Sequence, residues 1–211
     1  MGKPNIKEIC QLAPVVPVLV IDDLDTAAPL AKALVAGGLR ALEITLRTPA
    51  ALEAISLIAD TVPAAVVGVG TLRTANDVTA ALKAGAQFGV SPGLSRAVLD
   101  AADEVALPML PGVATPSEAM VAADRGFELL KFFPAEANGG VPVLKAWGSA
   151  LRELTFCPTG GVTAENAPTY LALDNVTAVG GTWIAPPKLI HAKNWLEIEE
   201  RARFASQISI A

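Results

Sequence analysis

The chain has 211 residues, of which 52% are hydrophobic and 18% charged, and its net charge at pH 7 is −5. This length fits one domain with a large core, and a negative chain without runs of Lys and Arg is not typical of a nucleic-acid-binding protein. No apolar run approaches the ~20 residues of a membrane span, and one His and two Cys are too few for a metal site built on those ligands.

From residue 15 onward, short apolar and β-branched segments alternate with Ala-rich segments of helical period, after an amphipathic start at 5–12. We predict strands at 15–21, 41–46, 65–70, 88–92, 107–112, 129–134, 155–160 and 177–182. Helices are predicted at 25–36, 50–60, 74–84 and 116–124, and Gly37, Gly85 and Gly126 stand at expected helix ends. The alternation is typical of βα units and a parallel sheet. With eight strands and no linker, it favours an α/β fold in which residues 1–211 form one (β/α)8 TIM barrel.

The second predicted strand carries charged residues near its end. Glu43 and Arg47 alternate with the apolar Leu42 and Ile44, so both are expected to approach the interior and the rim of the barrel. In a barrel of this class, the carboxyl ends of the strands hold the active site. One interpretation is a Glu–Arg ion pair that seals the mouth of the barrel. The other is a proton-transferring carboxylate beside a cation that binds a substrate carboxylate.

The third and fourth predicted strands end in small polar or turn-forming residues. Thr71 follows two glycines at the end of the third strand, and the fourth ends in Ser91, Pro92 and Gly93. Each of these residues fits an ordinary turn. Their interpretation therefore depends on which side chains lie beside them.

A lysine interrupts the sixth predicted strand, LLKFFP, at 129–134. Because side chains alternate, Leu129, Lys131 and Phe133 share one face, which we predict to be the interior. A buried lysine is costly unless it is paired or neutral. It either reaches outward to solvent, closes a buried ion pair, or serves as a nucleophile that reacts as the neutral amine.

The last two strands end in glycine pairs beside a threonine: Thr159, Gly160 and Gly161, and then Gly180, Gly181 and Thr182. In this fold class, the loops after strands seven and eight often bind phosphate through backbone N–H groups. Two such pairs in consecutive units predict an anion site there.

Taken together, the strand-end residues of this sequence resemble those of the 2-keto-3-deoxy-6-phosphogluconate (KDPG) aldolase family, which includes the 4-hydroxy-2-oxoglutarate (KHG) aldolases. The segments that carry the resemblance are ALVAGGLRALEITLRT at 33–48, VGVGTL at 67–72, AGAQFGVSPG at 84–93, KFFPAEANGG at 131–140, CPTGGV at 157–162 and VGGTW at 179–183. The resemblance implies a cofactor-free and metal-free lyase of the Schiff-base type, assembled as a homotrimer. The implied partner is a small phosphorylated keto acid, with no nucleic acid or membrane bound, and we expect a cytoplasmic location.

By the same resemblance, Lys131 forms the imine and Glu43 is the general acid and base. The remaining positions implied to bind substrate are Arg47 and Thr71 at its carboxylate, Pro92 and Phe133 around the pyruvate unit, and Thr159, Gly160, Gly161, Gly181 and Thr182 at its phosphate. Thr182 departs from the Ser that is usual in the family, but it keeps the hydroxyl.

Three alternatives stay open from the sequence. The first is an aldolase that acts on the gluconate epimer, because Thr159 matches the family members with that substrate, whereas galactonate-specific members have Val there. An aldolase that prefers the galactonate epimer, or an unphosphorylated substrate such as 4-hydroxy-2-oxoglutarate, remains a second possibility. A noncatalytic barrel that only binds a sugar phosphate is the third, because fold alone does not determine function.

Overall fold

The computed structural model describes residues 5–210, in which short strands alternate with helices. The strands are β1 (Val15–Leu19), β2 (Ala41–Thr45), β3 (Val66–Gly70), β4 (Phe88–Val90), β5 (Met109–Leu110), β6 (Gly112–Val113), β7 (Leu129–Phe132), β8 (Thr155–Pro158) and β9 (Val179–Gly181). The α-helices are α1 (Ile6–Cys10), α2 (Ala27–Ala36), α3 (Ala51–Thr61), α4 (Ala75–Lys83), α5 (Arg96–Glu104), α6 (Pro116–Asp124), α7 (Gly140–Ala150), α8 (Ala167–Leu171), α9 (Pro187–His191) and α10 (Trp195–Ser206). Two 3-10 helices, η1 (Leu24–Thr26) and η2 (Glu136–Asn138), complete the pattern.

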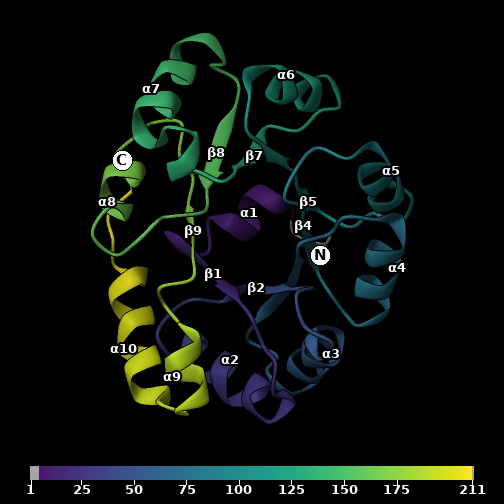
Figure 1. Ribbon diagram of the computed structural model, residues 1–211, viewed down its shortest axis with the longest axis vertical. Coiled ribbons are helices and arrows are strands. Elements are labelled where there is room, and N and C mark those ends of the chain that lie inside the picture. Colours follow the sequence, from purple (N-terminus) through teal and green to yellow (C-terminus); the bar gives the residue numbers. More distant parts are fainter. Residues whose placement is uncertain (1–4, 211) are drawn as a thin grey trace.

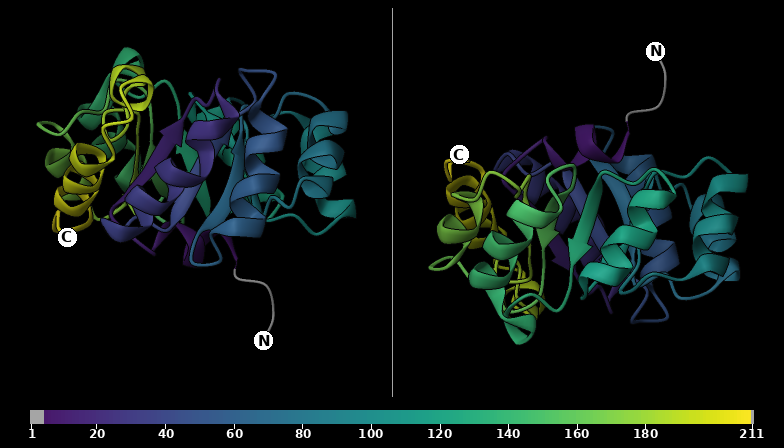
Figure 2. Two further views of the ribbon diagram at one scale, coloured as in Figure 1. Left: turned by 90° about the horizontal axis from the view of Figure 1, so that it is seen from below. Right: turned by 90° about the horizontal axis from the view of Figure 1, so that it is seen from above.

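All strand pairs in the described residues are parallel, as the βα alternation predicts. They form a six-stranded sheet of order β5-β4-β3-β2-β1-β9 and a three-stranded sheet of order β6-β7-β8. Figure 1 shows the strands curling around a common centre with the helices other than α1 outside, and the side views in Figure 2 agree with this arrangement. The predicted parallel α/β fold is confirmed. Among the described residues, regular pairing is divided between these two curled sheets and does not run continuously around eight strands.

The predicted strand at 107–112 is the one that differs in kind from the prediction, because the structure divides it into β5 and β6 at Pro111. Proline has no N–H to donate to a neighbouring strand, which interrupts the ladder. Its carbonyl still accepts from Lys131 N at 2.9 Å. On one side of the break β5 pairs with β4, and on the other side β6 pairs with β7. The interrupted strand therefore lies between the two sheets.

A capping side chain or a glycine marks the ends of some of the helices. Thr115 and Glu118 form a reciprocal capping box at the start of α6, whose bounds match the predicted 116–124. Gly85 and Gly126, which follow α4 and α6, adopt positive φ angles of 92° and 87°. This conformation is open to glycine at little steric cost, which explains why these helices end there.

Two apolar clusters fill the molecule. The larger one lies between the strands and the outer helices, and the smaller one lies inside the curled sheet. Helix α1 contributes Ile9 and Cys10 to the inner cluster, where they meet Phe88, Leu129 and Cys157. In Figure 1, α1 lies in the middle of the strands. The amphipathic start predicted at 5–12 therefore closes one end of the interior.

Both cysteines are free thiols buried in this inner cluster. A hydrogen bond with Cys157, together with burial, raises the pKa of the Cys10 thiol well above its usual value. Cys10 therefore stays protonated and packs as a small apolar side chain.

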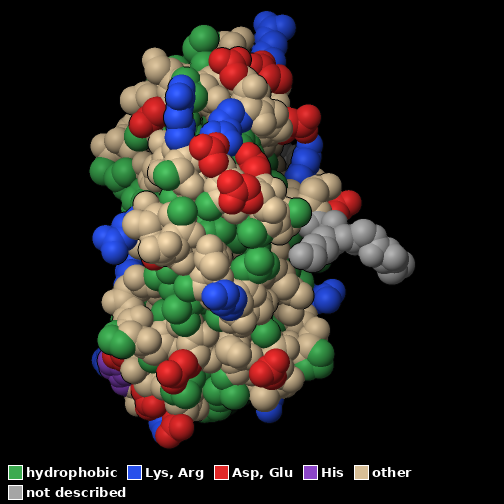
Figure 3. All heavy atoms as spheres, turned by 90° about the vertical axis from the view of Figure 1, so that its right-hand side faces the viewer, with side chains coloured by type: hydrophobic (Ala, Val, Ile, Leu, Met, Phe, Trp, Pro, Cys, Tyr) green, Lys and Arg blue, Asp and Glu red, His purple; other side chains and the backbone are tan. Residues whose placement is uncertain are grey.

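One face of the molecule carries charges of both signs rather than one basic field. On the face shown in Figure 3, Lys and Arg side chains are interspersed with Asp and Glu. Among residues 5–210, no helix is long and apolar enough to cross a membrane.

Candidate active site

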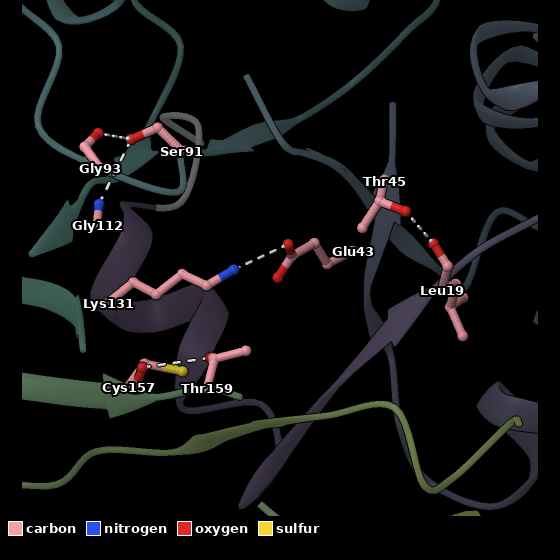
Figure 4. A network of polar contacts seen from close by, with 9 residues as sticks. All are labelled: Leu19, Glu43, Thr45, Ser91, Gly93, Gly112, Lys131, Cys157 and Thr159. Atoms are coloured by element: carbon pink, nitrogen blue, oxygen red, sulfur yellow. Dashed lines mark hydrogen bonds and ion pairs between the residues drawn. The ribbon is translucent and has the colours of Figure 1, made fainter. Parts of the chain in front are cut away.

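Lys131 on β7 and Glu43 on β2 face each other inside the curled sheet, although 88 residues separate them in the chain. Lys131 Nζ lies 3.2 Å from Glu43 Oε1, and the two residues are 5% and 2% exposed. Figure 4 shows both side chains pointing into the same space. The predicted interior face of β7 is thus confirmed, because Leu129 joins the inner cluster while Leu130 and Phe132 pack against the helices.

Gly70 on β3 makes room for the Glu43 carboxylate. A Cβ at Gly70 would lie 2.3 Å from Glu43 Oε1 and 2.7 Å from its Cγ, closer than real atoms approach. The register pairs Gly70 with Thr45, one inward-facing position beyond Glu43 on β2. A glycine at this point therefore fixes where the carboxylate lies.

Two predicted pocket residues, Phe133 and Pro92, lie near Lys131. Its Nζ lies 5.2 Å from the centre of the Phe133 ring, a cation–π distance. Gly112 is the register partner of Lys131 on β6, and a Cβ there would lie 2.5 Å from the backbone carbonyl of Pro92. The structure therefore brings Lys131, Phe133 and Pro92 to one region, as the sequence predicts.

Arg47 lies apart from this buried pair. It follows β2 by two residues and is exposed, and its backbone N–H donates to Thr45 O at 2.8 Å. Within residues 5–210, the carboxylate of Glu43 pairs with Lys131 and not with Arg47. The Glu–Arg pair considered from the sequence is therefore not the arrangement found, and Arg47 remains available at the rim.

Thr71 immediately follows β3 and is partly buried, with a positive φ of 65°. A non-glycine residue in this conformation is uncommon, and such residues are concentrated at functional sites. Thr71 directly follows Gly70, which contacts Glu43.

The two glycine-rich loops at the ends of β8 and β9 lie against each other. Thr159 forms a parallel bridge with Gly180, and a Cβ at Gly180 would lie 2.2 Å from Thr159 Oγ1. Thr159 is buried, whereas Thr182 is exposed. Within the described residues, the N–H groups of Gly160 and Gly161 donate to no protein acceptor. Gly160 and Gly161 therefore present free donors at this end of the site.

Two buried hydroxyls near the site were given no role from the sequence. Thr45 Oγ1 donates to Leu19 O at 2.9 Å, and Ser91 Oγ donates to Gly93 O at 2.9 Å. Ser91 Oγ also accepts from the N–H of Gly112, at 3.4 Å. Both hydroxyls satisfy neighbouring backbone groups. Thr45 joins β2, which carries Glu43, to β1, and Ser91 joins the end of β4 to β6, the strand that pairs with β7. The alternation of Thr45 with Glu43 was the available signal for its inward direction.

An amine and a carboxylate are buried together inside the curled parallel sheet, an arrangement that an enzyme of the α/β class can use. The chain belongs to the KDPG and KHG aldolase family, whose model matches residues 6–201. It is a lyase, which excludes the noncatalytic sugar-phosphate-binding alternative.

The chain is similar to curated and solved members of this family over nearly its whole length. It is 48% identical to the 2-dehydro-3-deoxy-phosphogluconate aldolase of Dickeya dadantii over 203 residues, 96% of this chain and 95% of the relative. A crystal structure of the Legionella pneumophila KDPG aldolase, with pyruvate captured as a covalent carbinolamine, is similar with a TM-score of 0.95 and 43% identity, covering 98% of this chain and 100% of that one. The Zymomonas mobilis enzyme with 3-phosphoglycerate has a TM-score of 0.94 and 45% identity, covering 100% and 99%.

Proposed function

We propose that this chain cleaves 2-keto-3-deoxy-6-phosphogluconate to pyruvate and glyceraldehyde 3-phosphate through an imine on Lys131. The observation that carries the proposal is the buried contact of Lys131 Nζ with Glu43 Oε1 at 3.2 Å. A buried ion pair alone fits a structural role too, and it contributes little net stability compared with apolar packing. The covalent pyruvate adduct of the Legionella pneumophila relative favours the catalytic role.

The geometry supports Glu43 as the group that moves protons. Its Oε1 lies within hydrogen-bonding distance of Lys131 Nζ, as proton transfer between the two groups requires. Glu43 takes a proton from the Lys131 ammonium, and the neutral amine adds to C2 of the keto acid. Glu43 then returns the proton to the carbinolamine hydroxyl, which leaves as water and forms a protonated imine.

The imine then acts as an electron sink for bond cleavage. Glu43 removes the proton of the C4 hydroxyl, the C3–C4 bond breaks, and its electron pair moves to C3 as the imine becomes an enamine. Glyceraldehyde 3-phosphate leaves as the aldehyde. The enamine takes a proton at C3, and water hydrolyses the imine to release pyruvate and the free lysine.

The remaining predicted residues are proposed to bind the two charged ends of the substrate. Arg47 and Thr71 lie on the β2 and β3 side and hold the carboxylate, while Pro92 and Phe133 surround the pyruvate unit. Free N–H groups of Gly160 and Gly161, with Thr159, Gly181 and Thr182, bind the phosphate, as expected for oriented backbone donors. The Zymomonas mobilis relative with bound 3-phosphoglycerate supports a phosphate end. Activity on 4-hydroxy-2-oxoglutarate is proposed from the family, which includes KHG aldolases.

Three further properties are part of the proposal. The two sheets would close into one single-domain (β/α)8 barrel, supported by parallel bridges from Phe156 to Val176 and from Thr159 to Gly180. A homotrimer is supported by exposed apolar side chains such as Met120 and Val121 on α6. A cytoplasmic location stays a prediction from the sequence.

Reductive trapping tests the proposed function. Borohydride added with pyruvate is expected to inactivate the enzyme and add one pyruvate-derived mass to the peptide that contains Lys131, because only an imine is reduced in this way. Lys131→Met should abolish labelling, whereas Lys145→Arg, a change at an exposed lysine of α7, should not. Labelling at Lys83 or Lys145 in the parent protein would refute the assignment.

A further inference from the structure

The carbonyl groups of the 159–161 loop are all occupied by donors from two neighbouring segments. Two of these donors are backbone N–H groups of the segment after β7, and the third is a side-chain amide at the start of α8. The bonds run from Ala135 N to Thr159 O at 2.8 Å, from Glu136 N to Gly160 O at 3.0 Å, and from Asn166 Nδ2 to Gly161 O at 3.2 Å. With its carbonyls held on one side, the loop keeps the N–H groups of Gly160 and Gly161 free.

The side chain of Glu136 packs directly on this loop. A Cβ at Gly161 would lie 2.5 Å from Glu136 Cγ and 2.6 Å from its Cβ, and Gly161 has a positive φ of 80°. Both observations require glycine at Gly161. The position of Glu136 therefore determines how the loop can lie.

Tyr170 on α8 fixes the Glu136 side chain from the other end. Its hydroxyl donates a hydrogen bond to Glu136 Oε1, and its side chain is fully buried. Burial, followed by the contact with Glu136, raises the pKa of Tyr170, so the phenol stays a neutral donor. Gly140 adds to the fit, because a Cβ there would lie 2.9 Å from the Tyr170 hydroxyl and 3.2 Å from Glu136 Oε1.

We propose that Glu136 and Tyr170, here called the Glu136–Tyr170 latch, are positioning residues that hold the phosphate-binding loop and make the enzyme selective for phosphorylated substrates. Neither residue needs to contact the substrate. The latch acts through the backbone of the 159–161 loop, so this inference rests on the proposed phosphate end. The hydrogen bond from Tyr170 also directs the Glu136 carboxylate toward α8, and so fixes the acidic side chain that packs on Gly161.

The latch predicts a split between substrates and between kinetic constants. Tyr170→Phe removes only the hydroxyl, and Glu136→Ala removes the carboxylate and its packing on Gly161. Each change should raise KM for 2-keto-3-deoxy-6-phosphogluconate on the order of tenfold, the size of one lost hydrogen bond, with kcat within about threefold. KM for 4-hydroxy-2-oxoglutarate, which has no phosphate, should stay within about twofold. Glu136→Gln keeps an oxygen that accepts from the Tyr170 hydroxyl, so its KM should stay close to that of the parent enzyme.

Controls separate a latch from a general stabilising contact. Glu153→Ala removes an exposed carboxylate at the opposite end of β8 and should change neither KM. Melting curves measured beside the assays show whether Tyr170→Phe, a change at a buried residue, is folded. Glu136→Ala removes the same hydrogen bond by a change at an exposed residue. Equal changes in KM on both substrates, or an unchanged KM on the phosphorylated one, would overturn the latch.

The test also distinguishes failure of the latch from failure of the proposed function. Thr182→Ala, measured on the same two substrates, reports on the phosphate end directly. If Thr182→Ala is selective for the phosphorylated substrate while Tyr170→Phe and Glu136→Ala are not, only the latch is wrong. If Thr182→Ala affects both substrates equally, the phosphate end is misassigned and the latch falls with it, while the imine assignment is judged by trapping at Lys131.

Discussion

Replacing Glu43 by Gln separates the chemical role of the buried pair from its structural one. The substitution keeps the volume next to Gly70 but removes the negative charge 3.2 Å from Lys131 Nζ. A general acid–base group contributes about 10² to 10⁴ in rate, so kcat per folded molecule should fall by that factor. The variant should still be folded and should still be labelled, slowly, by pyruvate and borohydride.

The stability change follows from burial of the pair. Exposed ion pairs contribute roughly 0–1 kcal/mol, but removing one partner of a buried pair costs about 3–5 kcal/mol because the remaining charge is unpaired. With exposures of 5% and 2%, Lys131 and Glu43 belong to the second class. For a chain of this size, each kcal/mol corresponds to about 2–4 °C, so the melting temperature of Glu43→Gln should fall by roughly 6–20 °C.

A double-variant cycle refutes or supports this reasoning. Lys131→Met combined with Glu43→Gln leaves no unpaired charge, so urea unfolding should show the double variant to be more stable than Glu43→Gln alone. Additive losses would show that the two side chains do not interact as the structure indicates. A normal rate per folded molecule in Glu43→Gln, together with a large loss of stability, would show that Glu43 is only a structural partner.

Three other changes are expected to have measurable effects. Thr182→Ala should lower kcat/KM for 2-keto-3-deoxy-6-phosphogluconate by about 10 to 150-fold, the effect of one hydrogen bond to a charged group, and leave 4-hydroxy-2-oxoglutarate within a few-fold in parallel assays. Gly70→Ala should displace the Glu43 carboxylate, because its Cβ would lie 2.3 Å from Oε1, and lower kcat at least tenfold; an unchanged kcat would show that the carboxylate position does not matter. Because the pKa of Tyr170 is raised, its stabilising effect should be fully present below about pH 10, the value of an unfolded tyrosine, and decrease above it. Urea unfolding of the parent and Tyr170→Phe at pH 8 and pH 10.5 measures this, and a constant difference would contradict it.

The strands and the inward direction of their polar residues were predictable because they depend on local alternation. Lys131 and Glu43 each stand among apolar neighbours with a period of two, which is enough to place both on an inner face. Their distance was not predictable, because it depends on how β2 and β7 lie across the interior, 88 residues apart in the chain. The family resemblance supplied roles for these residues that alternation alone left open.

Other features lacked a local signal. The interruption at Pro111 follows from the missing N–H, but the apolar run at 107–112 reads as continuous. Glu136 lies in the segment KFFPAEANGG, where the sequence predicts roles for Lys131 and Phe133 only. Its partner Tyr170 is 34 residues away, on a helix that the sequence pattern does not define. Contacts between loops of successive βα units therefore needed the three-dimensional arrangement.

Glycines inside the strands show how the fold accommodates this site. A glycine within a strand costs roughly 0.5–1 kcal/mol relative to alanine. A Cβ at Gly68 would lie 2.2 Å from the Phe88 ring, one at Gly70 would lie 2.3 Å from Glu43, and one at Gly180 would lie 2.2 Å from Thr159. Phe88 belongs to the inner apolar cluster together with α1. Glu43 lies at the proposed reaction centre, and Thr159 lies at the proposed phosphate end. At Gly70 and Gly180 the space of the missing Cβ is filled by a buried polar side chain. Alanine has the higher intrinsic strand propensity, but its Cβ would clash with that side chain. The parallel scaffold thus gives up intrinsic strand stability at the positions where the proposed chemistry needs space.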